Sequence, residues 1–82
     1  MGQYANIKSK RFIRVLKWLA RRKGVELKKA GNHIYKITCI HNGQAYPLPV
    51  SHREVNSHIV KDFGEWLVRN TICSKEEYDS QL

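Results

Sequence analysis

Apolar residues recur at two different spacings along the chain, and each change of spacing marks a new element. Between residues 9 and 23 they recur every three or four positions, which predicts an amphipathic helix. Its apolar face consists of Phe12, Leu16, Leu19 and Ala20, widened by Ile13, Val15 and Trp18. Ser9 is the expected N-cap, and Gly24 follows where a left-handed residue commonly ends a helix.

Shorter runs predict three strands. Residues 25–30 alternate apolar and polar side chains, and residues 33–40 are rich in isoleucine, tyrosine and threonine. The third run, residues 46–50, contains Pro47 and Pro49. The turn signals between the runs are Gly31-Asn32, which can supply positive φ angles, and Asn42-Gly43. Because the two prolines lack amides on one side of the strand, we expect that strand at the sheet edge.

A second amphipathic helix is expected from Ser57, as its N-cap, to about Asn70. Its predicted buried face consists of Ile59, Val60, Phe63, Trp66 and Leu67. Ser74 and Glu77 have the spacing of a capping box, which predicts a last helical turn. The sequence therefore predicts one α+β domain over residues 1–82. It comprises a helix, a three-stranded antiparallel sheet, a helix and a short C-terminal helical turn, with residues 1–7 as a flexible tail.

Charge is distributed unevenly along the 82 residues. The chain has 15 basic and 7 acidic residues, and eleven of the basic ones lie between Lys8 and Lys36 against one acid, Glu26. Such asymmetry favours a polyanionic partner, nucleic acid before a membrane. No apolar run approaches the ~18 residues needed to span a bilayer, and no signal-peptide pattern begins the sequence. We therefore expect a cytoplasmic protein.

The two cysteines give no sign of a metal site or a disulfide framework. Cys39 and Cys73 are far apart, and no Cys-x-x-Cys spacing occurs. Cys39 and His41 can offer two ligands to a metal, but two ligands do not make a site. We expect neither metal nor cofactor, and two buried thiols.

Several strings resemble one family. They are Gly31-Asn32-His33, the strand at residues 46–50 leading into a histidine-containing loop, the second helix, and residues 72–78. In order and spacing they are similar to the HicA-type (YcfA-like) toxins, which are small mRNA interferases on the double-stranded RNA-binding fold. The resemblance implies a catalytic role for His33, mRNA as substrate, and a HicB-type antitoxin that covers the active site.

The chain departs from the family pattern at two positions. Asn32 stands where the family has serine or threonine, and Tyr35 comes two residues after His33 instead of three. In a regular strand, Tyr35 would share a face with His33 unless a bulge intervenes. Aligning on Ile34-Tyr35 instead places Asn32 at the catalytic position, which predicts an inactive relative.

His33 has the chemistry that RNA cleavage needs. RNA carries its own nucleophile, the 2′-hydroxyl, and an imidazole with a pKa near 6.5 exchanges protons at neutral pH. Neighbouring lysines can stabilise developing oxyanions. A second proton-transfer group stays open, with His52 or a lysine as candidates. The candidate RNA-binding residues are Lys28, Lys29, Lys36, Arg53, Lys10 and Arg14.

Three hypotheses follow from the sequence. The first is a metal-independent endoribonuclease toxin, and the second is a non-catalytic RNA-binding module with the same surface. The third is a protein-interaction domain that adds a strand at its open sheet edge, although Pro47 and Pro49 blunt that edge. The basic face of the first helix is either a phosphate-binding surface or a solvated one.

Overall fold

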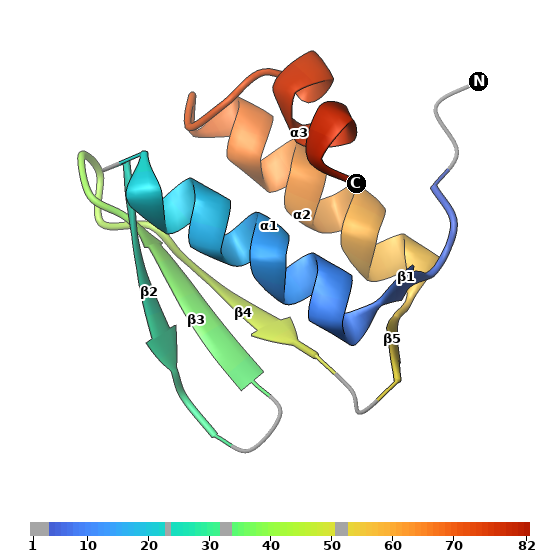
Figure 1. Ribbon diagram of the computed structural model, residues 1–82. Coiled ribbons are helices and arrows are strands. Elements are labelled where there is room, and N and C mark those ends of the chain that lie inside the picture. The colour runs from blue at the N-terminus through green and yellow to red at the C-terminus, as the bar shows by residue number, and fades with distance from the viewer. Residues whose placement is uncertain (1–3, 23, 32–33, 51–52) are drawn as a thin grey trace.

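Two long amphipathic helices cover one face of a three-stranded antiparallel sheet (Figure 1). The computed structural model describes residues 4–22, 24–31, 34–50 and 53–82. The helices are α1 (Ser9–Arg21) and α2 (Ser57–Arg69), and a shorter helix, α3 (Lys75–Gln81), follows them. The predicted α+β order of helix, three strands, helix and short C-terminal helix is therefore confirmed.

The sheet consists of β2 (Val25–Lys29), β3 (Ile34–Cys39) and β4 (Ala45–Pro49) in the order β2-β3-β4. Its helix-covered face holds the buried residues at alternate positions, Val25, Ile37, Cys39 and Leu48 among them. The β4 strand lies at an edge, as its two prolines predict. The other edge strand, β2, carries two lysines at its end, which discourage addition of a further strand.

A second, two-stranded sheet was not predicted. The strands β1 (Ile7–Lys8) and β5 (Glu54–Val55) pair antiparallel, with Ile7 opposite Val55. This pairing holds the loop before α2 against the start of α1, where the Ser9 amide donates to the Arg53 carbonyl at 2.9 Å. Arg53 is thereby brought next to the first turn of α1.

Both helix starts differ from the predicted caps by one residue. Lys8 is the N-cap of α1 and makes no side-chain cap bond, while Ser9 is the first helical residue and is buried. Asn56 is the N-cap of α2, where its side-chain oxygen accepts from the His58 amide at 2.8 Å. The predictions of Ser9 and Ser57 as caps are wrong: the Ser9 amide donates to the distant Arg53 carbonyl, and in α2 the preceding residue, Asn56, is the cap.

One of the two predicted turn glycines adopts a positive φ angle and the other does not. Gly43 has φ +74 in the β3–β4 turn, as its Asn42-Gly43 signal predicts. Gly31 does not adopt this left-handed region, and Asn32 lies outside the described residues. Helix α1 ends at Arg21, earlier than expected, with Arg22 as its C-cap.

The predicted helix faces form the core. Phe12, Leu16 and Leu19 of α1 are buried, and so are Val60, Phe63, Trp66 and Leu67 of α2, whereas Ile59 is only partly buried. The Phe63 ring is central, with the Phe12 ring centroid 5.8 Å away and the Tyr46 centroid 5.3 Å away. Cys39 and Cys73 are free and buried, as predicted.

Helix α3 is fixed to α2 through Tyr78. The capping box of Ser74 and Glu77 is present, and the Ser74 amide and the Arg22 guanidinium keep the pKa of Glu77 below its ordinary value. The buried Tyr78 hydroxyl donates to the Val60 carbonyl at 2.7 Å. Its ring lies directly against Gly64, where a methyl group would come within 2.6 Å of a ring carbon.

The described part of residues 1–7 makes specific contacts. The Tyr4 hydroxyl donates to Asp79 of α3 at 2.6 Å, and the Tyr4 and Tyr78 ring centroids are 6.1 Å apart. Burial and this hydrogen bond raise the pKa of Tyr4 to about 12. The Asn6 side chain accepts from the Ser57 amide at 2.8 Å. Residues 4–7 are therefore attached to both α2 and α3.

Within the described residues, no helix has the length and apolar character that crossing a membrane requires.

Gly64→Ala should destabilise the protein even though alanine favours helix by about 1 kcal/mol. The new methyl group overlaps the Tyr78 ring, and overpacking of this kind costs about 1–3 kcal/mol. The free energy of unfolding, measured by urea denaturation, should therefore fall. Glu65→Ala, at the exposed neighbouring position, should change it by no more than about 0.5 kcal/mol. Equal stability of the two variants would contradict the close contact.

Thr71→Gly should stabilise the protein by about 1 kcal/mol. Thr71 follows the C-cap of α2 at φ 54, a region that disfavours β-branched residues. The Thr71 amide donates to Val68 and the Ile72 amide to Leu67, a pattern that usually has glycine at the left-handed position. Thermal unfolding measures the effect, and Thr71→Ala should gain less because alanine keeps its Cβ.

Candidate nucleic-acid interface

Helix α1 carries a stripe of cations on the side opposite its core face. Lys10, Arg14, Lys17 and Arg21 are spaced by four, three and four residues, so they lie along one line of the helix. All four are exposed, and none pairs with a described carboxylate. The line extends for about 16 Å, at 1.5 Å of rise per residue. We call these four residues the α1 stripe.

The α1 stripe costs stability. Like charges three or four residues apart on a helix destabilise it by about 0.2–0.5 kcal/mol per pair. Three such pairs follow one another here, and the first turn of α1 holds no acidic residue to offset them. A bound polyanion would neutralise the four charges and so remove this repulsion, which favours binding.

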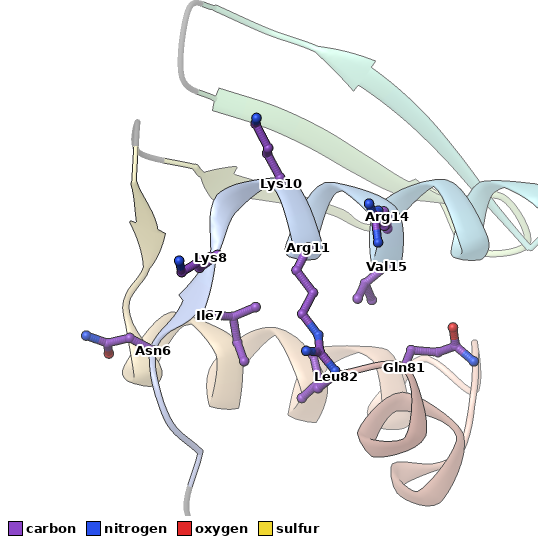
Figure 2. A pocket seen from close by; sticks show the side chains of 9 residues that line it. All are labelled: Asn6, Ile7, Lys8, Lys10, Arg11, Arg14, Val15, Gln81 and Leu82. Atoms are coloured by element: carbon purple, nitrogen blue, oxygen red, sulfur yellow. The ribbon is translucent and has the colours of Figure 1, made fainter.

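A hollow of about 770 Å³ lies beside the stripe, between the first half of α1, β1 and the C-terminal end (Figure 2). Four cations line it, together with an apolar floor and two amides. The lining residues are Lys8, Lys10, Arg11 and Arg14, then Ile7, Val15 and Leu82, then Asn6 and Gln81. In Figure 2, Arg11 points toward Leu82 while Lys10 points away from it. We call this the α1 hollow.

A second hollow of about 580 Å³ adjoins the first. It is lined by Lys8, Lys10, Arg53 and Glu54, so it shares two lysines with the α1 hollow. Glu54 accepts a hydrogen bond from the Asn6 side chain at 3.4 Å and is the one acidic side chain among the described residues that line either hollow. We call this the Arg53 hollow. The two hollows together place five cations around the start of α1.

The β2–β3 hairpin separates its three lysines between two faces. Lys28 lies directly opposite Lys36 in the strand register, and both are on the face that the helices leave uncovered. Lys29 lies opposite Tyr35, on the helix-covered side of the sheet. The lysines therefore do not form one cluster. Lys28 also lies 3.7 Å from Glu26, an exposed contact that contributes little.

The catalytic candidate His33 lies outside the described residues, and so do Asn32 and His52. Described neighbours bracket the hairpin end: the Ala30 amide donates to the Ile34 carbonyl at 2.8 Å. Tyr35 is partly buried and packs against the core, on the same face as Ile37. Whether His33 shares that face stays a prediction.

The structure divides the predicted RNA-binding residues into two groups. Lys10, Arg14 and Arg53 lie around the two hollows at the start of α1, on the helical side of the molecule. Lys28 and Lys36 lie on the open face of the sheet. All six predicted residues, Lys29 included, are exposed.

Sequence reasoning missed Arg11 and Lys8 as site residues. Arg11 stands about 100° around the helix from Lys10, away from the α1 stripe. Its importance comes from Leu82 and Ile7, which complete the hollow from distant parts of the chain. No pattern in the sequence indicates that Arg11, Ile7 and Leu82 lie close together, although Lys10-Arg11 marks a basic turn of the helix.

The remaining histidines and cysteines lie away from the hollows. His41 and His58 are exposed, as expected, and the His41 Nδ1 atom lies 3.2 Å from the Cys39 sulfur. Among the described residues, no three histidine, cysteine or acidic side chains are grouped so as to hold a metal ion.

Comparison with known proteins identifies no relative. The chain matches no protein-family model, no curated protein and no solved structure. The resemblance to HicA-type toxins carried by residues 31–33, 46–50 and 72–78 therefore stays a prediction.

Lys17→Glu should raise stability and lower affinity for polyanions. The substitution replaces two like-charge pairs, with Arg14 and Arg21, by two attractive ones, worth about 0.5–1.5 kcal/mol in total at low salt. Urea denaturation measures the stability, and the salt needed to elute the protein from heparin measures the affinity.

Lys61→Glu is the matched control because it makes the same charge change on α2, away from the stripe. It places two glutamates four residues apart, with Glu65, and should lower stability. Equal loss of heparin retention in both variants would show that net charge alone, and not the stripe, determines binding.

Proposed function

We propose that this chain is a HicA-like toxin of a toxin-antitoxin module, a metal-independent endoribonuclease that binds mRNA and cleaves it with His33. The observation that carries the binding half is the unpaired cationic surface at the start of α1. Together the α1 stripe and the two hollows present seven exposed cations, against one acidic side chain among the described lining residues. The cations are Lys8, Lys10, Arg11, Arg14, Lys17, Arg21 and Arg53.

The charge pattern favours a nucleic acid over other polyanions. Phosphate contacts from lysine and arginine provide most sequence-independent affinity for nucleic acids, through release of counterions. Arginines also give planar, bidentate contacts to phosphate oxygens. The stripe is straight and exposed, so successive phosphates can follow it.

The fold supports the same proposal at a coarser level. A helix, three antiparallel strands and a helix, with both helices on one sheet face, is the arrangement that the resemblance implies. A fold alone does not carry a function, so the activity depends on the residues of the site.

The chemistry assigned to His33 is a transesterification. The imidazole removes the proton of a 2′-hydroxyl, whose oxygen forms a bond to the neighbouring phosphorus while the bond to the 5′-oxygen breaks. The products are a cyclic phosphate and a free 5′-hydroxyl, once a proton reaches the leaving oxygen. Lys28 and Lys36, which lie opposite one another in the adjoining strands, are the candidates for stabilising charge on the phosphorane.

The partner and the compartment follow from the resemblance. A HicB-type antitoxin would cover the active site, and its acidic groups would replace RNA phosphates on the cationic surface. Both proteins would act in the cytoplasm, where mRNA is available.

A non-catalytic RNA-binding module is the second candidate. It is favoured by Asn32, which replaces the family's serine or threonine, and by the shorter spacing from His33 to Tyr35. The same cationic surface would then retain RNA without cleaving it.

His33→Ala should abolish cleavage of a long RNA by the purified protein in the presence of EDTA, a loss of about 10²–10⁴-fold. Cleavage is followed by gel electrophoresis, and the toxicity of the expressed protein should disappear with it. RNA retention should persist because the cations of α1 are unchanged. The circular dichroism of the variant should match the wild type.

His58→Ala is the control, since His58 is exposed at the start of α2 and has no assigned role. Undiminished cleavage by His33→Ala would rule out His33 as the catalytic residue. Retention of RNA without cleavage by the wild type would favour the non-catalytic module, and with it the alternative alignment that places Asn32 at the catalytic position.

A further inference from the structure

We infer that the two adjoining hollows at the start of α1 form a binding path for single-stranded RNA, and that the chain prefers single strands to duplexes. The inference rests on the proposed RNA-binding function and deepens it by naming the form of RNA. It also adds Arg11 and Lys8 to the residues that bind.

The path is continuous because the hollows share two side chains. The two hollows adjoin at Lys8 and Lys10, which line both the α1 hollow and the Arg53 hollow. Arg14 lies at one end and Arg53 at the other. The β1–β5 pairing and the bond from the Ser9 amide to the Arg53 carbonyl hold this end in place.

The shape of the path favours an unstacked strand. The bases of an RNA duplex are stacked and paired, so a duplex cannot turn a base into a hollow. A single strand can turn a base inward while its phosphates stay on the rim. The α1 hollow, at about 770 Å³, is open to solvent and has room for a base.

The lining of the α1 hollow matches the two parts of a nucleotide. Arg11 and Arg14 supply guanidinium groups that bind phosphate and that stack on bases. Ile7 and Leu82 are partly buried and give the apolar floor, and the Gln81 amide can donate and accept at a base edge. No aspartate or glutamate side chain lines this hollow among the described residues.

Arg11 separates the path from the exposed stripe. It lies off the line of the α1 stripe and points toward Leu82 across the hollow (Figure 2). A duplex bound to the α1 stripe would not contact Arg11, whereas a single strand in the α1 hollow would contact it. Arg11 is therefore the residue whose loss should weaken single-strand binding and leave duplex binding unchanged.

The test uses the full chain and a short fluorescent 2′-O-methyl oligouridylate, which lacks the free 2′-hydroxyl and cannot be cleaved. Fluorescence anisotropy compares this strand with the same strand paired to its oligoadenylate complement. The wild type should bind the single strand about tenfold more tightly. Arg11→Ala should weaken single-strand binding about tenfold and reduce its salt slope by about 0.7, while duplex binding changes less than about twofold.

Arg69→Ala is the matched control because it removes the same charge from an exposed site on α2, away from both hollows. It should change single-strand affinity by less than about twofold, and thermal unfolding should show that both variants stay folded. The inference would be wrong if both variants weakened single-strand binding equally, or if the wild type bound the duplex more tightly than the single strand. It would also be wrong if free UTP competed for the protein as well as the oligonucleotide does.

The outcomes separate this inference from the proposed function. If the wild type binds neither form of RNA, the proposed function fails and the inference falls with it. If the wild type binds RNA and Arg11→Ala binds as well as the wild type, the inference alone fails.

Discussion

The separation of apolar and basic residues on α1 is the constraint on which the rest of the structure depends. Phe12, Leu16 and Leu19 must leave water together, and they do so against the sheet and α2, where Phe12 contacts Phe63 edge to face. Once that face is buried, the helix has one orientation about its axis. The opposite line of cations then necessarily faces solvent. The core and the candidate interface are therefore two results of one helical periodicity.

Much of the fold could be predicted from such periodicity. The parts that could not be predicted are those that form through contacts between distant segments. The apolar spacing predicted both long helices, and Pro47 and Pro49 predicted the edge position of β4, because a missing amide is a local property. The two-residue strands β1 and β5 have no alternation to detect. The cap at Ser9 was wrong for the same reason, because the Ser9 amide is satisfied by Arg53, which is far away in sequence. The cap at Ser57 was wrong for a local reason: the preceding Asn56 is itself a preferred N-cap residue.

The candidate site was predictable in its residue types and not in its shape. The distribution of basic residues predicted Lys10, Arg14 and Arg53 as site residues, and the structure places them around the two hollows. Pairing across the predicted hairpin brought Lys28 alongside Lys36, and the two are opposite one another in the structure. The pleat, however, turns Lys29 to the other side of the sheet, which a count of neighbouring lysines ignores. The hollows arise where α1, β1 and the end of α3 meet, so their shape is a tertiary property. The hairpin lysines and the hollows thus lie on different sides, and a partner that reaches both must bend around the molecule.

The wall of the α1 hollow also connects binding to the docking of α3. Gln81 and Leu82 line the hollow from the end of this seven-residue helix, which is too short to be stable alone. Its position depends on the Tyr78 ring against Gly64, on the Tyr4 hydrogen bond to Asp79, and on the ion pair between Arg22 and Glu77 at 3.0 Å. A ligand that contacts Leu82 binds only the docked helix, so by linkage it must stabilise that docking. Packing between α2 and α3 therefore contributes to how well the hollow is formed.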